Sequence, residues 1–386
     1  MSLRNKAVIV GVGESDIGKM PHMTGLGLNA QAAKRAIDDA GLKVSDIDGL
    51  LTAYSFTEPY FMLGTVMAEY LGLKPRFCAS MSVGGASPAA MLHHAAMAVA
   101  QGQCNTVLVC AGENRATGMT RDEAVAALAA VGHPYFEAPY GASIPALYAL
   151  IAQRYMHEFG LSREALASVA VMARRHAGLH PNAHMRKPIT AADVLNAKPI
   201  AEPLTMLDCC LISDAGGAFI VTSPERARDR PCKPAYLLGI GECHTHEHLL
   251  CADSLTRFGA VESGRAAYAM AGLGPKDMDL AQLYDCFTIV PIIELEELGF
   301  CAKGEGGRLI DEGVTEIGGA LPVNTSGGLQ ARGEPLGASH YGQIYEIVTQ
   351  LRGGAGSRQV EGATVGLAQV FGAWGHCGVT ILKRAL

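Results

Sequence analysis

The sequence of 386 residues contains no apolar run close to the roughly 20 residues that a helix needs to cross a bilayer. Its first residues, MSLRNKAVIVGVGES, also lack the apolar core and the cleavage site of a secretory signal peptide. The net charge is -6 at pH 7, and no cluster of Lys and Arg provides a basic surface for nucleic acid or lipid head groups. We therefore expect a cytoplasmic protein that binds neither nucleic acid nor a membrane.

Zinc and disulfide patterns are missing as well, although the chain has 11 cysteines. No paired CxxC motifs occur, and the thiols of a protein that is not secreted stay reduced. His244, His246 and His248 alternate along the chain, and such a triplet can bind zinc when the segment is extended. Because the triplet lies away from the predicted pocket, a solvated polar loop is the favoured interpretation. No metal site is predicted.

Apolar and small residues, in contrast, are plentiful. Apolar residues make up 49% of the chain, charged residues only 18%, and there are 46 glycines. This composition is typical of a well-buried enzyme with many turns and excludes a disordered or fibrous chain. The chain is too long for one small core, so we expect one large α/β unit or two fused domains.

An internal repeat divides the chain into two similar parts. The segment AVIVGVGES (residues 7–15) returns as AYLLGIGEC (235–243). Further on, DDAGLKVSDIDGLLTAYSFT (38–57) returns as AMAGLGPKDMDLAQLYDCFT (269–288), with the matching residues at a constant offset. Two copies of one supersecondary unit indicate a protein of two pseudo-twofold-related halves.

Each copy reads as strand, helix and strand. In the first copy, residues 7–12 are apolar and β-branched, residues 28–40 have the spacing of an amphipathic helix that ends before Gly41, and residues 49–55 are again strand-like. Alternating strands and helices predict a mainly parallel sheet covered by helices. The glycines of GVGESDIG have the wrong spacing for the GxGxxG fingerprint, so no dinucleotide site is predicted.

The predicted domains follow from the repeat. We assign residues 1–230 to an N-terminal half and residues 231–386 to a C-terminal half. A segment from about 117–206 has no counterpart and is interpreted as an insertion, with helices near 144–159 and 164–177.

Three blocks then carry a specific resemblance. They are PLTMLDCCLISDAGGAFIVTS (203–223), LYDCFTIVPIIELEELGFCAKGEGG (283–307) and LPVNTSGGLQARGEPLGASHYGQIYEIVTQLRGG (321–354). In combination they resemble the thiolase superfamily, and more narrowly the sterol-carrier-protein-2-type thiolases and their relatives called lipid-transfer proteins, which act in lipid metabolism. The resemblance covers nearly the whole chain, and the internal repeat agrees with it independently.

The resemblance implies a fold and a set of catalytic positions. Thiolases are α/β proteins of two βαβαβαββ halves packed as a five-layered αβαβα sandwich, and they are usually homodimers. Their nucleophilic Cys begins a buried helix, where the helix dipole and backbone N–H groups favour the thiolate. A His in a GHP motif and a second Cys in a CxG motif move protons, and an Asn- or His-containing loop helps to form an oxyanion hole.

In this sequence the nucleophile position falls on glycine. The helix is marked by Ser87 as an expected N-cap and by Pro88 behind it, and counting by family spacing places the nucleophile at Gly85. Cys78 lies upstream in the preceding strand and is interpreted as a small buried core thiol. Ser87 lacks the GxSxG elbow of a serine nucleophile. Gly85 and Ser87 are therefore predicted to line the substrate site without reacting.

The GHP position reads Gly333-Glu334-Pro335, so a glutamate replaces the histidine. A carboxylate in an enclosed apolar pocket has a raised pKa and can act as base or acid. The competing interpretation is a structural, hydrogen-bonded glutamate. By the same resemblance, we predict that Asn324 and Gly337 contact the substrate.

The CxG position falls near Gly372, so the second catalytic Cys is also replaced. His376 and Cys377 follow closely and are the candidate replacements. An unperturbed histidine titrates near neutral pH, which makes His376 the better base, against a structural role of similar weight. For Cys377, packing in the core is the stronger interpretation.

The oxyanion-loop position carries a tyrosine. In the thiolases that the chain resembles the motif is His-Asp-Cys-Phe, and here Tyr284 replaces the His. A phenol can donate a hydrogen bond to an enolate or, if activated, remove a hydroxyl proton. The alternative is a buried structural hydrogen bond.

These replacements predict a change of reaction. The resemblance implies that relatives without the Cys act as retro-aldolases, which cleave a β-hydroxyacyl-CoA and use a tyrosine at the oxyanion loop. Such relatives work with a small OB-fold, zinc-ribbon partner of the DUF35 type. We therefore expect an acyl-CoA thioester as the substrate, no tightly bound cofactor, a homodimer and a DUF35-type partner.

The sequence leaves two alternatives open. One is an acyltransferase, similar to acetyl-CoA acetyltransferase, in which Cys377 or Cys286 carries the acyl group. The other is a non-catalytic subunit that binds acyl-CoA or lipid.

Overall fold

The computed structural model describes residues 2–141, 143–228 and 230–384, and it contains one nine-stranded mixed sheet and a small two-stranded sheet. The strands are β1 Val8–Glu14, β2 Gly49–Ala53, β3 Phe77–Met81, β4 Thr106–Asn114, β5 Pro199–Ala201, β6 Leu204–Thr205, β7 Asp214–Thr222, β8 Ala235–His244, β9 Leu280–Gln282, β10 Val365–Gly372 and β11 His376–Arg384. The α-helices are α1 Gly25–Asp39, α2 Leu63–Leu71, α3 Ser87–Ala100, α4 Arg115–Gly118, α5 Arg121–Ala129, α6 Ile144–Phe159, α7 Arg163–Gly178, α8 Ala191–Leu195, α9 Pro224–Ala227, α10 Ala260–Ala271, α11 Ile289–Glu297, α12 Gly306–Asp311 and α13 Ser339–Arg352.

The large sheet consists of two half-sheets joined at the centre. Its strand order is β3-β2-β4-β7-β1-β8-β11-β10-β9, and β1 and β8 pair over only two residue positions. On either side of this joint the order is the same, because β7, β4 and β2 correspond to β11, β10 and β9. The counterpart of β3 in the second half is reduced to one bridge between Ala281 and Val323.

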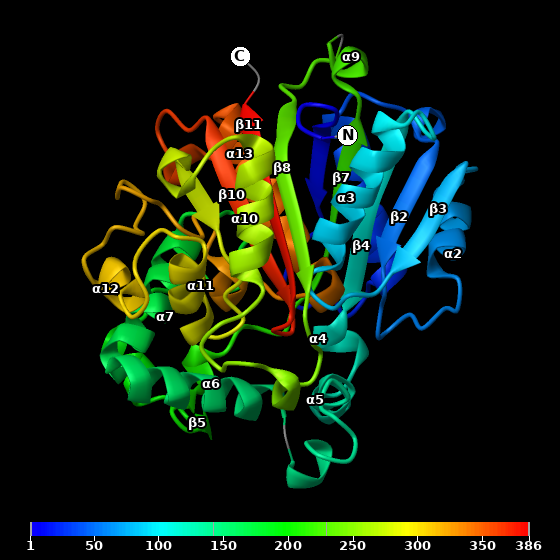
Figure 1. The fold of residues 1–386 in the computed structure, drawn as a ribbon. Helices are drawn as coiled ribbons and strands as arrows, with labels where there is room; N and C mark the ends of the chain where they lie inside the picture. Colours follow the sequence, from blue (N-terminus) through cyan, green and yellow to red (C-terminus); the bar gives the residue numbers. More distant parts are fainter. Residues whose placement is uncertain (1, 142, 229, 385–386) are drawn as a thin grey trace.

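Helices cover both half-sheets and fill the space between them. Helices α1 and α2 pack on the first half-sheet, and α10 packs on β8 and β11 of the second. Helix α3 contacts strands of the first half-sheet as well as β11, and α13 contacts β9 and β10 as well as β1 and β7. These two helices therefore form the central layer (Figure 1). The five-layered arrangement of two similar halves confirms the predicted fold class.

Glycines explain why the repeat is visible in the sequence. A Cβ atom added to Gly11 would lie 2.2 Å from the carbonyl oxygen of Ala36 in α1. In the second half, a Cβ atom added to Gly239 would lie 2.1 Å from the carbonyl oxygen of Ala267 in α10. The first strand of each half thus carries glycine because its helix packs too closely for any side chain.

A pair of aspartates repeats for a similar reason. Asp48 accepts hydrogen bonds from the backbone N–H groups of Asn105 and Thr106, where β4 begins. Asp279, at the matching position, accepts them from Thr364 and Val365, where β10 begins. In both halves the carboxylate satisfies backbone donors at the start of the neighbouring strand.

The segment from α4 to β6 lies at one end of the sheets, where β4 ends, and both chain termini lie at the other end (Figure 1). Its helices α6 and α7 confirm the two helices predicted in the insertion. No helix in the described part of the chain combines the length and the apolar character needed to cross a membrane.

The predicted mainly parallel sheet was wrong, because five of the eight strand pairs in the described large sheet are antiparallel and three are parallel. Two local predictions were wrong as well. Ser87 is the first residue of α3 and not its N-cap, which is Ala86, because the hydroxyl of Ser87 binds the preceding loop instead. Cys78 is exposed and not a core thiol, because β3 is the edge strand of the sheet and has no neighbouring strand on one side within the described part of the chain.

Candidate active site

The two positions expected to carry catalytic cysteines meet in the centre of the molecule. Both are occupied by glycine, Gly85 and Gly372. A Cβ atom added to Gly372 would lie 2.1 Å from the carbonyl oxygen of Val83. A Cβ atom added to Gly85 would lie 2.5 Å from the carbonyl oxygen of Phe371. Distances this short exclude a side chain unless the backbone moves. Neither position offers a nucleophile or the room for one.

The loop that contains Gly85 is held by Ser87. The hydroxyl of Ser87 donates to the carbonyl of Gly84 at 2.7 Å and accepts from the N–H of Val83 at 3.0 Å. With both hydrogen bonds in use, this hydroxyl shapes the loop at the start of α3. It is a positioning group for the glycines that line the site.

Tyr284 directs its hydroxyl toward the vacant nucleophile position. The oxygen would lie 3.3 Å from a Cβ atom added to Gly85. Burial and then the charges of neighbouring groups, among them Cys286 and Glu334, raise the pKa of Tyr284 well above its usual value. The phenol therefore keeps its proton at neutral pH, which makes it a hydrogen-bond donor and not a base.

Backbone contacts fix the position of Tyr284. Its N–H donates to the side chain of Gln369 at 3.3 Å, and the N–H of the preceding Leu283 donates to Oδ1 of Asn324 at 2.7 Å. Asn324 adopts a positive φ of 49° and is 1% exposed. The structure thus places Asn324 behind the tyrosine loop, where it holds the backbone, and its predicted contact with substrate stays a prediction.

Glu334 is buried, and only one of its two carboxylate oxygens is hydrogen-bonded within the part of the chain that the structure describes. Oε1 accepts hydrogen bonds from Oγ of Ser339 at 2.6 Å and from the N–H of Leu336 at 2.9 Å. Oε2 has no partner among the described residues. Burial raises the pKa of Glu334 to about 7, although Ser339 and Arg115 act in the opposite direction. A carboxyl group with this pKa can accept and return a proton near neutral pH.

Gly337 follows in the same loop and packs on the first half of the chain. A Cβ atom added to it would lie 2.8 Å from the carbonyl oxygen of Tyr54. This contact joins the Glu334 loop to the end of β2. A direct role of Gly337 in substrate binding stays a prediction.

Sequence reasoning missed Arg115 and Cys210. Arg115 directly follows β4, is 7% exposed, and its charge lowers the pKa of Glu334. Burial raises the pKa of the Cys210 thiol well above its usual value, with a further contribution from Glu334. The signal for Arg115 was its place at the end of a strand beside β2, because parallel strands gather their C-terminal residues at one edge.

His376 and Cys377 lie on opposite faces of β11, as neighbours in a strand must. Nδ1 of His376 lies 2.9 Å from Nδ1 of His244, in a polar cluster at the end of the strand, and burial lowers the pKa of His376. Cys377 faces α10, where its sulfur accepts a hydrogen bond from Oγ of Ser263 at 3.0 Å. Neither side chain bonds to Tyr284 or Glu334, and their catalytic roles stay predictions.

None of the thiols near the centre is prepared to act as a nucleophile. Burial raises the pKa of Cys377 and of Cys286 well above the usual thiol value. A reactive cysteine needs the opposite shift, because the thiolate is the attacking species.

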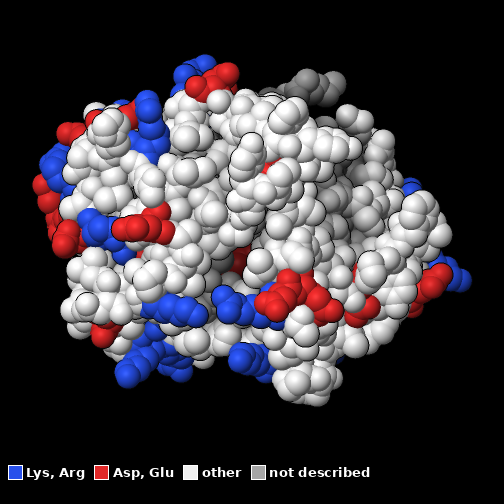
Figure 2. Space-filling view, turned by 90° about the horizontal axis from the view of Figure 1, so that it is seen from below, with Lys and Arg blue, Asp and Glu red and all other residues white. Residues whose placement is uncertain are grey.

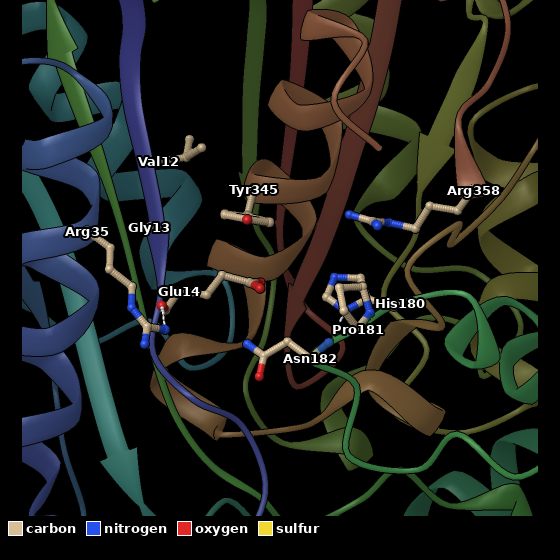
Figure 3. A pocket seen from close by; sticks show the side chains of 9 residues that line it. All are labelled: Val12, Gly13, Glu14, Arg35, His180, Pro181, Asn182, Tyr345 and Arg358. Carbon is tan, nitrogen blue, oxygen red and sulfur yellow. Dashed lines mark hydrogen bonds between the residues drawn. The ribbon is translucent and has the colours of Figure 1, made fainter. Parts of the chain in front are cut away.

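A separate cavity of about 160 Å³ opens on another part of the surface. Figure 3 shows Arg35 on one side, Arg358 and His180 on the other, and Tyr345 between them. Neither Tyr284 nor Glu334 lines this cavity. Its buried arginine is already paired, because Arg358 bonds to Glu346 at 3.0 Å.

The face that carries the insertion shows a hollow with Lys and Arg side chains along one side and an acidic side chain visible within it (Figure 2). Basic side chains beside a hollow suit a ligand that bears phosphate groups.

The chain is similar to known proteins along nearly its whole length. Residues 241–384 match the family described as Thiolase C-terminal domain-like. The chain is 37% identical to the acetyl-CoA acetyltransferase of Methanothermobacter thermautotrophicus, over 99% of this chain and 100% of the relative. It is 37% identical to the steroid side-chain-cleaving aldolase of Thermomonospora curvata, over 84% of this chain and 86% of the relative.

Among solved structures, the Ltp2-ChsH2(DUF35) aldolase matches with a TM-score of 0.88 and 34% identity, over 99% of this chain and 98% of that chain. The matched relatives include an acetyltransferase and aldolases, and they cover nearly the whole chain. The chain belongs to the thiolase superfamily, in the group of sterol-carrier-protein-2-type thiolase-like enzymes.

Proposed function

We propose that the protein cleaves a β-hydroxyacyl-CoA by a retro-aldol reaction. The observation that carries this proposal is the contact between Gly85 and its surroundings. The carbonyl oxygen of Phe371 and the hydroxyl of Tyr284 occupy the space beside Gly85, where thiolysis would need a thiol. A site without a nucleophile can still break a carbon–carbon bond, provided that it removes a proton and stabilises an enolate.

Glu334 is the proposed base. Its free Oε2 takes the proton of the β-hydroxyl group, and the bond between the α- and β-carbons breaks. The electrons of that bond move to the thioester carbonyl as an enolate, and the β-carbon leaves as a ketone or an aldehyde. The enolate then takes a proton at the α-carbon and becomes the shorter acyl-CoA, so that atoms and charge balance.

Tyr284 is the proposed enolate donor. It holds its proton because burial raises its pKa. It therefore supplies a hydrogen bond that is stronger to an enolate oxygen than to a neutral carbonyl, and only such a difference accelerates the reaction.

The relatives support both an aldolase and an acyltransferase, because steroid side-chain-cleaving aldolase and acetyl-CoA acetyltransferase are both among them. The raised pKa values of Cys286 and Cys377 count against an acyltransferase with a displaced nucleophile. They equally allow a non-catalytic acyl-CoA-binding subunit, which differs from the aldolase only in turnover.

We further propose a CoA thioester as the bound ligand, with its phosphates at the basic side of the hollow in Figure 2. A DUF35-type protein is the proposed partner, since the solved aldolase with the similar chain is a complex with such a protein. The cytoplasmic location stays a prediction.

A second copy of the chain is the proposed partner at the sheet edge. Strand β3 ends the sheet, and Cys78 and Ser80 are exposed on it. An open edge strand invites pairing with another strand. Next to it, Phe61 is 102% exposed and Met62 is 62% exposed, which suits an apolar interface. Sedimentation of the purified chain tests this directly, with a dimer expected.

Turnover of a simple neutral substrate tests the reaction. β-Hydroxy-β-methylbutyryl-CoA should give acetone and acetyl-CoA in equal amounts, with the DUF35-type partner present if it is required. Tyr284→Phe should lower kcat about 100-fold to 1,000-fold, as expected for the loss of one oxyanion donor. Binding of the CoA ester without turnover, also with the partner, would instead favour the non-catalytic subunit.

A further inference from the structure

Arg115 differs from the other buried arginines of the described chain. Arg115, Arg332 and Arg358 are each no more than 7% exposed. Arg332 forms an ion pair with Glu14, and Arg358 forms one with Glu346. Within residues 2–141, 143–228 and 230–384, the guanidinium of Arg115 has neither an ion pair nor a hydrogen bond, and its Nε atom is fully enclosed. A buried charge without a partner costs several kcal/mol, roughly, so it calls for an anion.

The acidic residue anchored beside Arg115 does not serve as that anion. Asp214 accepts hydrogen bonds from the backbone N–H groups of Ala116 and Thr117, at 2.7 Å and 3.1 Å. It also accepts from the hydroxyl of Thr117 and from the N–H of Met20. Asp214 therefore fixes α4 and the direction of Arg115 without contacting the guanidinium.

Glu334 is near enough for the charge of Arg115 to lower its pKa, but the two groups do not form an ion pair. Oε1 of Glu334 is held by Ser339 and Leu336, which sets the carboxylate in place. The charge of Arg115 also acts to lower the pKa of the Cys210 thiol, so the guanidinium lies by the same buried centre. When Glu334 takes a proton, Arg115 loses the nearby negative charge of that carboxylate.

We propose that Arg115 binds a carboxylate on the acyl chain, so that the substrate is the CoA thioester of an acidic β-hydroxy acid. This inference deepens the proposed function and rests on it for the β-hydroxyl group. The planar guanidinium matches a carboxylate with two parallel hydrogen bonds, which no other free group in the described part of the site offers. A neutral acyl chain leaves the guanidinium buried and unpaired, so that the cost of its desolvation is not offset.

Matched pairs of CoA esters test the proposal without any turnover. Succinyl-, glutaryl- and adipyl-CoA each differ from butyryl-, valeryl- and hexanoyl-CoA by a terminal carboxylate in place of a methyl group. Calorimetry should show tighter binding of at least one acidic ester than of its neutral match, on the order of tenfold to a hundredfold. Arg115→Gln should remove the preference and leave the affinity for the neutral esters unchanged, while Arg115→Lys should keep part of it.

Arg358→Gln is the matched control, because it removes an equally buried guanidinium that has a protein partner. It should lower the melting temperature and leave the preference for acidic esters intact. Equal affinities of the wild-type protein for all three pairs would overturn the proposal. An equal loss of affinity for acidic and neutral esters in Arg115→Gln would overturn it as well, because a structural role predicts that outcome.

Turnover separates this inference from the proposed function. β-Hydroxy-β-methylglutaryl-CoA and β-hydroxy-β-methylvaleryl-CoA differ by the same exchange of carboxylate for methyl. At a pH above the Glu334 inflection of both proteins, Arg115→Gln should raise KM for the acidic substrate about tenfold or more and change kcat for the neutral one little. Preferred binding of acidic esters with no turnover of either substrate would contradict the aldolase and support the carboxylate site. An equal fall in kcat for both substrates would mean that Arg115 stabilises the enolate, and would overturn the carboxylate site.

Discussion

The two halves of the molecule send equivalent loops to the buried centre, but only one of these loops carries a reactive group. Gly84 and Gly85 stand before α3 in the first half, and Glu334 stands before α13 in the second. The scaffold residues are kept in both halves, as Gly11 and Gly239 show by their close contact with a helix. A symmetric scaffold thus holds an asymmetric site.

The first half contributes space and charge to that site. Its glycines leave room for the hydroxyl of Tyr284, and Arg115 supplies a positive charge from the end of β4. The second half contributes Tyr284, the proposed enolate donor, and Glu334, the proposed base. Substitutions in one half at a time therefore separate effects on the reacting groups from effects on the space and charge around them.

The largest expected effect is on the reactive loop of the second half. Glu334→Gln should lower kcat/KM for β-hydroxyacyl-CoA cleavage by about 100-fold to 10,000-fold, as for the loss of a general base. Since the pKa of Glu334 is about 7, the base form prevails above that pH, so wild-type kcat/KM should rise with pH and level off. A pH–rate profile measures this inflection.

Arg115→Gln should move the inflection to higher pH, because the positive charge of Arg115 lowers the pKa of Glu334. Glu334→Asp serves as the control that retains a carboxyl group and a titrating limb. A flat profile for the wild-type protein between pH 5 and pH 9, roughly, would contradict the role of Glu334.

The next largest effect is on stability, and it distinguishes a buried arginine that has an ion pair from one that has none among the described residues. Arg358→Met should lower the free energy of unfolding by about 3–5 kcal/mol, because it leaves Glu346 buried without its partner. Arg115→Met should leave that free energy unchanged or raise it, because it removes a buried charge that has no ion pair in the described chain. Denaturant unfolding measures both. A loss in Arg115→Met as large as that in Arg358→Met would show a hidden structural partner.

The smallest of these effects concerns the glycine loop of the first half. Gly85→Cys should not create a thiolase, because the added Cβ atom would meet the carbonyl oxygen of Phe371 at 2.5 Å. It should cost about 1–3 kcal/mol of stability through overpacking. Gly27→Ala, with ordinary contacts of 3.4 Å, is the matched control and should be neutral or stabilising. An acyl adduct on the introduced thiol of the Gly85→Cys variant, together with unchanged stability, would contradict this close packing.

Much of the fold follows from local signals in the sequence. The repeat predicted two similar halves, and the amphipathic spacing predicted α1, which begins at Gly25 and ends before Gly41 as expected within a few residues. The exposure of Cys78 could not be predicted in this way. It depends on which strand stands at the sheet edge, and that is a property of strand order and not of local pattern.

The site was only partly predictable. Gly85, Tyr284 and Glu334 lie near the same centre, as the motif spacing indicated. The opposite directions of His376 and Cys377 follow from strand alternation, which is a signal that the sequence itself contains. Arg115 belongs to no motif, and its importance comes from what it lacks among the described residues, a partner, which only tertiary structure reveals.

The central claim is that the protein breaks a carbon–carbon bond without a covalent acyl-enzyme. Intact-protein mass spectrometry and product analysis on one sample, after incubation with β-hydroxy-β-methylbutyryl-CoA, test it most directly. The account predicts equal amounts of acetone and acetyl-CoA and a protein of unchanged mass. An acyl adduct on any cysteine during turnover would contradict it.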